Sequence, residues 1–510
     1  MPRIHLFIGS FILLAAFSPV SAQPPRIDPA GIGGALLLCG DGEVSQLAWD
    51  RFVELAGGAK AKVVVVVADE QTSLPHLSSA LKKQDAGESE IVHLKDVAES
   101  MRKATGVWLG WSGDRRWTDS ARPNPVFEAF ADILRRGGVV ASSGSGAELI
   151  ASRRAFNLLP GGMVERATAE QGGTKRPALP HVLPGVVGFQ IERGAALLLQ
   201  GRTLSAVGDG KTIIHLAASK TLPARQITLQ GKKQEDLTAL RRAAFDRVSD
   251  FPPPKVETPI VEKGTLVIVG GGGMPDGLFQ KIVEYAGGAG KANIVIFPTA
   301  AEPPLKKRDT VAAAFRKAGA NKATLLYGQT LAEVESKKFL DTLKEATGLW
   351  FDGGRQWRFV DCYENTKTLP LMFDVLARGG VIGGTSAGAT IQGEYLCRGG
   401  VFNNFDIRYP GYERSLGFLK GVAIDQHFTQ RKRQGDMTSL MKTYPQYLGI
   451  GLDESTAIVV QGQVAEVVGH GKVHFYDAQR QAEKGQPDFE ALSAGARYDL
   501  KQRKILTDAP

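Results

Sequence analysis

A serine in the second half of the chain stands in a pattern that could support nucleophilic catalysis. Ser386 lies within 379–392, GGVIGGTSAGATIQ, where an apolar run meets two glycines before a helical pattern begins. Residues 384–388 fit G-x-S-x-G, the pattern of a nucleophile on a sharp strand-to-helix turn. The backbone amide of Ala387 would be the first donor to an oxyanion formed there. The alternative interpretation is that Ser386 only caps the helix.

A serine nucleophile needs a base, and the second half of the chain offers three histidines. His427 follows the apolar run 422–424 and the polar pair 425–426, so it stands at a predicted strand end, as Ser386 does. His470 lies in a turn-like VGHGK, and His474 lies in the strand predicted after it. The spacing therefore favours His427 as the base.

The elements that would position these residues occur twice along the chain. Short Val/Ile runs such as Val63–Val67 and Ile294–Phe297 predict buried strands, and helical patterns such as 278–286 and 371–377 alternate with them. That alternation predicts an α/β fold made of two tandem copies of a mainly parallel, three-layer α/β/α domain. The similar blocks, which keep their order, are 34–40 with 264–270, 52–69 with 282–299, 104–111 with 346–353, 135–150 with 377–391 and 197–211 with 458–472.

Segment composition predicts four parts. A basic start, the apolar run 6–17 and small residues up to Ala22 are typical of a signal peptide at 1–22, which predicts export to the periplasm or the cell exterior. An N-terminal membrane anchor is the alternative, although the run is short for a span. The copies would occupy 23–228 and 263–510. Between them, 229–262 reads as a linker with a charged helical piece, 236–248, followed by the proline-rich DFPPPKVETP.

The overall composition narrows the classes of partner. The 510 residues carry a formal net charge of +9, which either favours an acidic polymer or is spread over solvated faces. No long Lys/Arg run or zinc-finger spacing occurs, so no nucleic acid is expected. Three cysteines predict neither a disulfide framework nor a metal site, and no cofactor is expected. Beyond the N-terminus no stretch predicts stable membrane insertion, and the sequence leaves a homo-oligomer open.

Several motifs together resemble the cyanophycinase family of serine peptidases. They are GTSAGA at 384–389, DQHFTQRKR at 425–433, LGIGLDESTA at 448–457 and FDGGRQ at 351–356, in place of the family's TGGDQ segment. The resemblance covers nearly all of 263–480. It implies a fold like that of class I glutamine amidotransferases, and hydrolysis of cyanophycin to β-aspartyl-arginine dipeptides. Cyanophycin is a polyaspartate backbone with arginine on each side-chain carboxyl. An aspartyl dipeptidase acting on short peptides and a catalytically silent polymer-binding protein are the alternatives.

The resemblance also implies roles for individual residues. Ser386 would be the nucleophile and His427 the general base, with the amides of Gly354 and Ala387 as oxyanion donors. The substrate pocket would be lined by Gln356, Asp425, Gln426, Arg431 and Arg433. Arginines suit this role because a guanidinium can hold a carboxylate bidentately. No metal ligand is expected.

The third member of the triad is the weakest point of the resemblance. The family's glutamate, about 18 residues after the nucleophile, falls here on Asn403-Asn404. Asp406 is the nearest acid in the same loop and is our prediction, with Glu394, Glu413 or an asparagine as alternatives. Two further departures, Arg355 for a family aspartate and Asp436 for a family arginine, leave the exact substrate open.

The first copy is predicted to be inactive. Aligned on the shared Arg-Gly-Gly, Ser386 falls on Gly144, and the flanking Ser143 and Ser145 are displaced from the elbow by one residue. The DQHF block has no counterpart, and Gln356 corresponds to Arg116. This copy would have a structural or interaction role. Alternatively it would bind polymer through Trp111, Arg115, Arg116 and Trp117.

Overall fold

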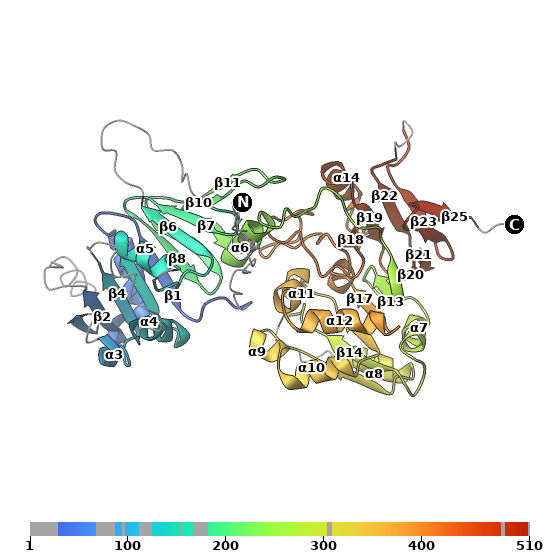
Figure 1. Cartoon of the computed structure of the whole chain (residues 1–510), viewed down its shortest axis with the longest axis horizontal. Helices are drawn as coiled ribbons and strands as arrows, with labels where there is room; N and C mark the ends of the chain where they lie inside the picture. The colour runs from blue at the N-terminus through green and yellow to red at the C-terminus, as the bar shows by residue number, and fades with distance from the viewer. Residues whose placement is uncertain are drawn as a thin grey trace, which may run out of the picture.

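The computed structural model describes residues 29–67, 87–93, 97–111, 125–153, 155–166, 182–302, 309–480 and 485–507. Figure 1 shows two groups of sheets and helices beside each other, the first coloured blue to cyan and the second yellow to red. The chain passes from one group to the other through the green helix α6 (Leu237–Asp246) and an extended segment. The predicted signal peptide lies outside the described residues.

The first half contains an eight-stranded sheet of order β12-β9-β8-β1-β5-β4-β2-β3 and a four-stranded sheet of order β11-β10-β7-β6. The large sheet comprises β1 (Ala35–Cys39), β2 (Lys62–Val67), β3 (Glu88–His93), β4 (Gly106–Gly110), β5 (Val139–Ser143), β8 (Ala195–Gln200), β9 (Thr203–Gly208) and β12 (Gln234–Asp236). The small sheet comprises β6 (Gly162–Arg166), β7 (Val187–Ile191), β10 (Thr212–Leu216) and β11 (Arg225–Leu229). The α-helices are α1 (Gln46–Ala56), α3 (Val97–Ser100), α4 (Pro125–Arg135), α5 (Ser145–Ala151) and α6.

The second half contains a nine-stranded sheet of order β15-β14-β16-β17-β13-β20-β21-β24-β25 and a four-stranded sheet of order β18-β19-β22-β23. The large sheet comprises β13 (Val261–Val269), β14 (Asn293–Phe297), β15 (Lys322–Leu325), β16 (Gly348–Phe351), β17 (Val381–Thr385), β20 (Thr456–Gly462), β21 (Val464–Gly469), β24 (Arg497–Asp499) and β25 (Lys504–Leu506). The small sheet comprises β18 (Val422–Gln426), β19 (Leu448–Leu452), β22 (Val473–Asp477) and β23 (Glu490–Leu492). The helices are α7 (Leu278–Tyr285), α8 (Asp309–Lys317), α9 (Leu331–Val334), α10 (Lys337–Lys344), α11 (Gln356–Tyr363), α12 (Thr368–Ala377), α13 (Ala387–Thr390) and α14 (Gln434–Thr443).

The large sheets are mixed, which corrects the prediction of mainly parallel sheets. Strands β13 to β17 of the second half pair in parallel, whereas β13–β20, β20–β21, β21–β24 and β24–β25 pair antiparallel. The first half has the same division, with antiparallel pairs β1–β8, β8–β9 and β9–β12. A tight turn such as Gly201-Arg202 can join only antiparallel neighbours, because a parallel pair needs a crossover.

Helices cover both faces of the second large sheet, as the prediction of layers required. Alternate residues of β13 face opposite sides, because side chains alternate along a strand. Leu266 and Ile268 pack in the same cluster as Met372 and Val375 of α12, whereas Val267 and Val269 pack with helix α7. The predicted strands at Val63–Val67 and Ile294–Phe297 and the predicted helices at 278–286 and 371–377 are all confirmed within a few residues.

The segment predicted as a linker, 229–262, is structured over much of its length. Its charged helical piece is helix α6, capped by the side chain of Asp236, and β12 adds an edge strand to the first large sheet. The proline-rich part that follows contains no helix or strand until β13 begins at Val261.

A buried charge network joins the two halves at this junction. The Arg202 guanidinium, at the β8–β9 turn, forms ion pairs with Asp236 (2.5 Å) and with Asp361 of α11 (2.8 Å). It also donates a hydrogen bond to the Tyr412 hydroxyl and lies 4.8 Å from the centre of the Trp357 ring. A buried cation without partners is costly, so these contacts require the two halves to dock in one arrangement.

We expect Arg202→Ala to reduce stability by about 3–5 kcal/mol, because the substitution leaves Asp236 buried without its cation and removes the nearer of the two arginines that pair with Asp361. Urea unfolding followed by circular dichroism measures the change. Arg51→Ala is the control, since Arg51 pairs with an exposed glutamate and its loss should cost about 0–1 kcal/mol. Equal stability of the two variants would contradict the importance of the buried network.

Candidate active site

Ser386 lies on the strand-to-helix turn that the sequence predicts. It follows β17 directly and precedes α13, with φ 55° and ψ −114°, a conformation that non-glycine residues rarely adopt. Its amide donates to the carbonyl of Val269, at the end of the neighbouring parallel strand β13. The serine side chain forms no capping hydrogen bond with α13. The geometry therefore does not support a simple helix cap.

The turn in the first half has nearly the same backbone conformation. Gly144 follows β5 and precedes α5 with φ 55° and ψ −126°. The alignment of Ser386 with Gly144 is therefore matched by the backbone, and no side chain is present at this position. The neighbouring Ser145 donates its hydroxyl to the carbonyl of Trp111.

His427 faces the serine, as predicted. It follows β18 of the small sheet, and its amide donates to the carbonyl of Gly270 at the end of β13. Its Nε2 lies 2.9 Å from the Oγ of Ser386. His470 lies instead beside Asp276 at the surface, and His474 packs against Phe428.

The acid that contacts His427 is Glu454, which corrects the prediction of Asp406. Glu454 Oε1 lies 2.6 Å from His427 Nδ1. The parallel pairing of β18 with β19, Gln426 opposite Leu452, brings both strand ends to one edge of the sheet. Glu454 therefore stands beside His427, although 27 residues separate them in the sequence.

The other acids that the sequence offered as the third triad member do not contact His427. Glu394 accepts from the amide of Gly421, and Glu413 accepts from the hydroxyls of Tyr395 and Tyr444. Asp406 is exposed and lines a cavity between the halves. Of the asparagine pair, the Asn403 side chain accepts from the amide of Phe405. None of these side chains is the observed partner of the His427 ring.

Asp425 and Arg433, predicted to bind substrate, bind each other instead. Asp425 has no exposed surface and accepts from Arg433 Nη1 at 2.8 Å and from Arg398 Nε at 2.9 Å. Arg433 also donates to the carbonyl of Gln426, directly before His427. Charged groups buried in this way need such partners. The three side chains thus hold the end of β18, and neither Asp425 nor Arg433 is presented to a substrate.

Gln356 is likewise a structural residue in this geometry. Its amide nitrogen, buried at the start of α11, donates to the carbonyls of Cys397 and Arg398. The neighbouring Arg355 donates to the carbonyls of Gly400 and Val401. Arg355, which stands in place of the family aspartate, thus holds the loop after residue 397. Asp436, the second departure, pairs with Arg398 at 2.6 Å.

The backbone at Gly353-Gly354 passes close to Ser386. A Cβ placed on Gly353 would lie 3.4 Å from the Cβ of Ser386. At Gly354, with φ 146°, a Cβ would lie 2.2 Å from the carbonyl oxygen of Ala300, so only glycine fits. Ala387 is the first residue of α13, where helix amides have no intrahelical acceptor. The predicted donors Gly354 and Ala387 therefore belong to segments that flank the serine.

Two predicted pocket residues remain available for a ligand. Arg431 is exposed, and its charge contributes to the environment of His427. Gln426 is buried, and its Oε1 has no hydrogen-bond partner within the described part of the chain. Arg431 thus adds a cation to the surroundings of His427, and Gln426, the residue before His427, carries an unfilled amide oxygen.

Burial is the main influence on the protonation of His427. Desolvation lowers the pKa of the imidazole, the hydrogen bond with Glu454 opposes that change, and the charge of Arg431 reinforces it. A lowered pKa keeps the ring neutral near pH 7, the state in which Nε2 can accept a proton. The geometry supports a serine nucleophile with a histidine base and a carboxylate that orients the ring.

Local pattern reasoning missed Glu454, although a signal for it was present. The apolar run LGIGL at 448–452 ends at Asp453-Glu454, just as the run at 422–424 ends near His427. Two acids directly after a second buried strand could have suggested the same sheet edge. Choosing between them needs the structure, in which Asp453 accepts from the amides of Thr429 and Lys472.

Comparison with known proteins matches this half of the chain. The model of peptidase family S51 matches residues 254–468. A cyanophycinase from Geminocystis herdmanii is 31% identical over 205 residues, which cover 40% of this chain and 75% of the relative. A cyanophycinase from Trichormus variabilis is 28% identical over 271 residues, covering 49% and 91%. A solved peptidase from an acI-B1 Actinobacterium has a TM-score of 0.38 and 23% identity, covering 46% and 97%.

The mixed α/β fold, the Ser386–His427 pair and these relatives define a serine-type peptidase. The chain belongs to peptidase family S51, with the matched region in its second half.

The described residues contain no helix that is both long and apolar enough to cross a membrane. They also contain no group of three or more His, Cys, Asp or Glu side chains placed to hold a metal ion. Arg115, Arg116 and Trp117, considered for polymer binding, lie outside the described residues, whereas Trp111 packs against the core of the first half.

We expect the acid limb of the kcat/KM profile of the native enzyme to have its midpoint below the ordinary histidine value of 6.5, because burial lowers the pKa of His427. Glu454→Gln should reduce kcat at least about a hundredfold, since the ring loses its orienting carboxylate. It should also move the midpoint to lower pH, because Glu454 raises the pKa of the histidine. Steady-state rates between pH 4 and 9 provide both measurements.

Glu466→Gln is the matched control, an exposed glutamate on β21, and should leave the profile unchanged. A native midpoint at or above 6.5 would show that burial does not dominate the pKa of His427. A Glu454→Gln enzyme with normal kcat would show that Glu454 does not orient the base.

Proposed function

We propose that the chain is a cyanophycin-hydrolysing serine peptidase whose single active site is Ser386, His427 and Glu454. The observation that carries the proposal is the continuous pair of hydrogen bonds from Ser386 Oγ through the His427 ring to Glu454. The relatives named cyanophycinase support the choice of substrate.

The proposed reaction proceeds through an acyl-enzyme. Ser386 Oγ attacks the carbonyl carbon of the scissile amide while His427 Nε2 takes the hydroxyl proton. The tetrahedral oxyanion faces the amides of Ala387 and Gly354. When the carbon–nitrogen bond breaks, His427 returns the proton to the leaving amine. A water molecule then attacks the ester carbon and gives a proton to His427. The bond between that carbon and Ser386 Oγ breaks, His427 returns the proton to Oγ, and the acid product leaves.

Substrate recognition in this proposal uses Arg431. Each arginine carried by cyanophycin retains a free carboxylate, and a guanidinium binds such a group with two hydrogen bonds. Arg431 is the exposed arginine of the DQHFTQRKR segment, whereas Arg433 is buried against Asp425. Gln426 Oε1, which lacks a partner within the described ranges, is an acceptor for a substrate N–H group.

The two halves are proposed to be tandem copies of one domain. In strand order, β3, β2, β4, β5, β1, β8 and β9 correspond to β15, β14, β16, β17, β13, β20 and β21. The small sheets correspond in the same way, β6 to β18 and β7 to β19. β6 is followed by Ala167, where β18 is followed by His427. With Gly144 in place of the nucleophile, the first copy lacks both reacting groups, which supports a non-catalytic role.

Two finer parts of the proposal rest on the sequence. The sequence predicts a fold like that of class I glutamine amidotransferases, and a strand of the second half does lead into the serine turn. The likeness to those enzymes stays a prediction. Export is proposed from the pattern of residues 1–22.

We expect Ser386→Ala to reduce hydrolysis of cyanophycin at least about a thousandfold, because the variant has no nucleophile. Release of β-aspartyl-arginine from purified polymer measures the loss. A serine-directed phosphonate should label the native protein at Ser386 and leave the variant unlabelled. Ser145→Ala, beside the equivalent turn of the first half, is the matched control and should hydrolyse normally.

Retention of hydrolysis by Ser386→Ala would place the chemistry elsewhere. Absence of both labelling and hydrolysis in the native protein would favour a silent polymer-binding protein. Because Arg355 and Asp436 depart from the family pattern, the assay should also include short aspartyl peptides as substrates. Rapid cleavage of aspartyl dipeptides without cleavage of polymer would instead identify an aspartyl dipeptidase.

We expect the secreted protein to begin at Gln23, because the small residues before it suit signal-peptidase cleavage. N-terminal sequencing of protein recovered from the periplasm and the medium of an expressing bacterium tests this. Retention of Met1 in protein confined to the cytoplasm would contradict export.

A further inference from the structure

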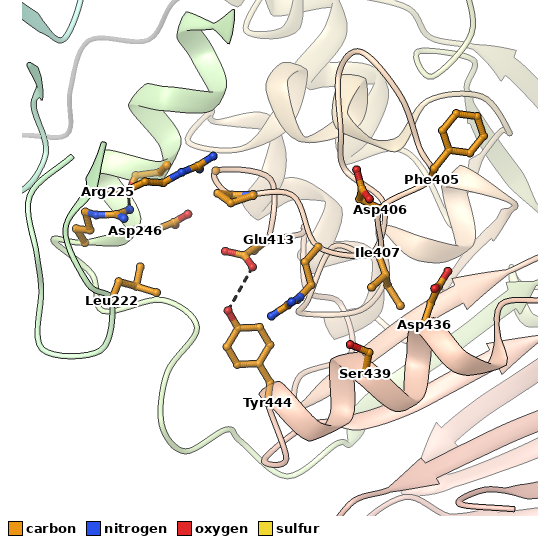
Figure 2. Close-up of a pocket in the computed structure, with 15 residues that line it drawn as sticks. Leu222, Arg225, Asp246, Phe405, Asp406, Ile407, Glu413, Asp436, Ser439 and Tyr444 are labelled. Atoms are coloured by element: carbon orange, nitrogen blue, oxygen red, sulfur yellow. Dashed lines mark hydrogen bonds between the residues drawn. The ribbon is translucent and has the colours of Figure 1, made fainter. Parts of the chain in front are cut away.

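A cavity of about 490 Å³ lies where the two halves meet. From the first half and the connecting helix it is lined by Arg225, the first residue of β11, and Asp246, the last residue of α6. From the second half it is lined by the loop around Asp406 and Glu413 and by α14. Figure 2 shows Arg225 and Asp246 on one side of Glu413, with Asp406 and Asp436 on the other.

Several charged groups of the cavity wall already have partners. Arg247 donates to the carbonyls of Ala217, Ala243 and Pro223, and Arg408 donates to the Thr443 hydroxyl. Asp246 pairs with Arg414, and Asp436 pairs with Arg398. Apart from Asp246 Oδ2, which is buried without a hydrogen-bond partner within the described residues, these groups leave little capacity for a ligand.

Three further groups of the wall retain unfilled capacity. Within the described part of the chain, neither the Arg225 guanidinium nor the Asp406 carboxylate has a hydrogen bond or an ion pair. Glu413 is 6% exposed, and both tyrosine hydroxyls donate to its Oε1, which leaves Oε2 as an acceptor. Burial raises the pKa of Glu413, so a bound cation or N–H donor would stabilise its carboxylate.

We propose that this cavity is a second binding site, for a zwitterionic peptide that carries a guanidinium. The ligand carboxylate lies on Arg225, an amide or ammonium N–H donates to Glu413, and the guanidinium pairs with Asp406. A free cation, a free anion and a buried acceptor between them match such a ligand better than a purely acidic or purely basic one. The volume is within the range of ordinary small-molecule sites.

The choice of an arginine-bearing acidic peptide rests on the proposed function, in which both the polymer substrate and the dipeptide product combine arginine with carboxylates. Either a side group of the polymer or a released β-aspartyl-arginine molecule supplies the same chemistry. The site borders the catalytic half, because Asp436 in the cavity pairs with Arg398, which pairs in turn with Asp425 before His427. It is completed by Arg225 of the first half, which gives that half a role in binding.

Calorimetry with full-length Ser386→Ala protein tests the proposal. β-Aspartyl-arginine should bind, whereas β-aspartyl-alanine, without the guanidinium, and argininamide, without the carboxylate, should bind more weakly. Adding Arg225→Ala should weaken β-aspartyl-arginine about tenfold and leave argininamide unaffected. Adding Asp406→Asn should weaken β-aspartyl-arginine similarly and leave β-aspartyl-alanine unaffected. Arg102→Ala and Asp209→Asn, exposed residues outside the cavity, are the matched controls.

Unchanged binding of β-aspartyl-arginine in both cavity variants, or no binding to Ser386→Ala protein, would overturn the proposal. Kinetics with Ser386 intact distinguish the two sources of the ligand. A higher KM for polymer in Arg225→Ala identifies a polymer side group, and weaker product inhibition alone identifies the released dipeptide. Failure of the proposed function is separate, because it is read from the hydrolysis assay: either Ser386→Ala protein still hydrolyses polymer, or the native protein does not.

Discussion

The site depends on one backbone constraint, the sharp turn by which β17 passes into α13. The turn requires Ser386 to adopt a positive φ, and the hydrogen bond from its amide to Val269 ties it to the end of β13. One residue further along β13, the carbonyl of Gly270 accepts the amide of His427. The end of a single strand thus fixes both the serine and the histidine, and their 2.9 Å contact follows from backbone bonds rather than from side-chain flexibility.

Buried charged residues also fix the segments that carry the site. Arg398, Asp425 and Arg433 neutralise one another beneath β18, and the bonds of Arg433 to Asp425 and to the Gln426 carbonyl hold the strand end that carries His427. On the other wall, α11 begins two residues after Gly354, and its Asp361 is held by Arg202 of the first half. The first half therefore stabilises the helix that borders the proposed oxyanion site, even though it has no nucleophile at the matching turn.

Local sequence patterns predicted what local backbone geometry determines. Ser386 and His427 could be found because each directly follows an apolar strand, and Gly144 could be excluded by counting from a shared Arg-Gly-Gly. Glu454 could not be chosen over Asp406, because its position depends on which strand pairs with β18 in a second sheet. Asp425 and Arg433 suggested a pocket because their chemistry suits one, but their pairing depends on Arg398, which lies far away in the sequence.

The comparison of Gly144 with Ser386 separates what the fold needs from what the chemistry needs. Both turns have φ 55°, so the positive φ belongs to the strand-to-helix connection itself. Glycine adopts that conformation without steric cost, whereas a serine there costs about 1–3 kcal/mol. Stability alone would therefore favour glycine in both halves. The serine stands where a histidine faces it, so the strain coincides with the site where a hydroxyl has a base beside it.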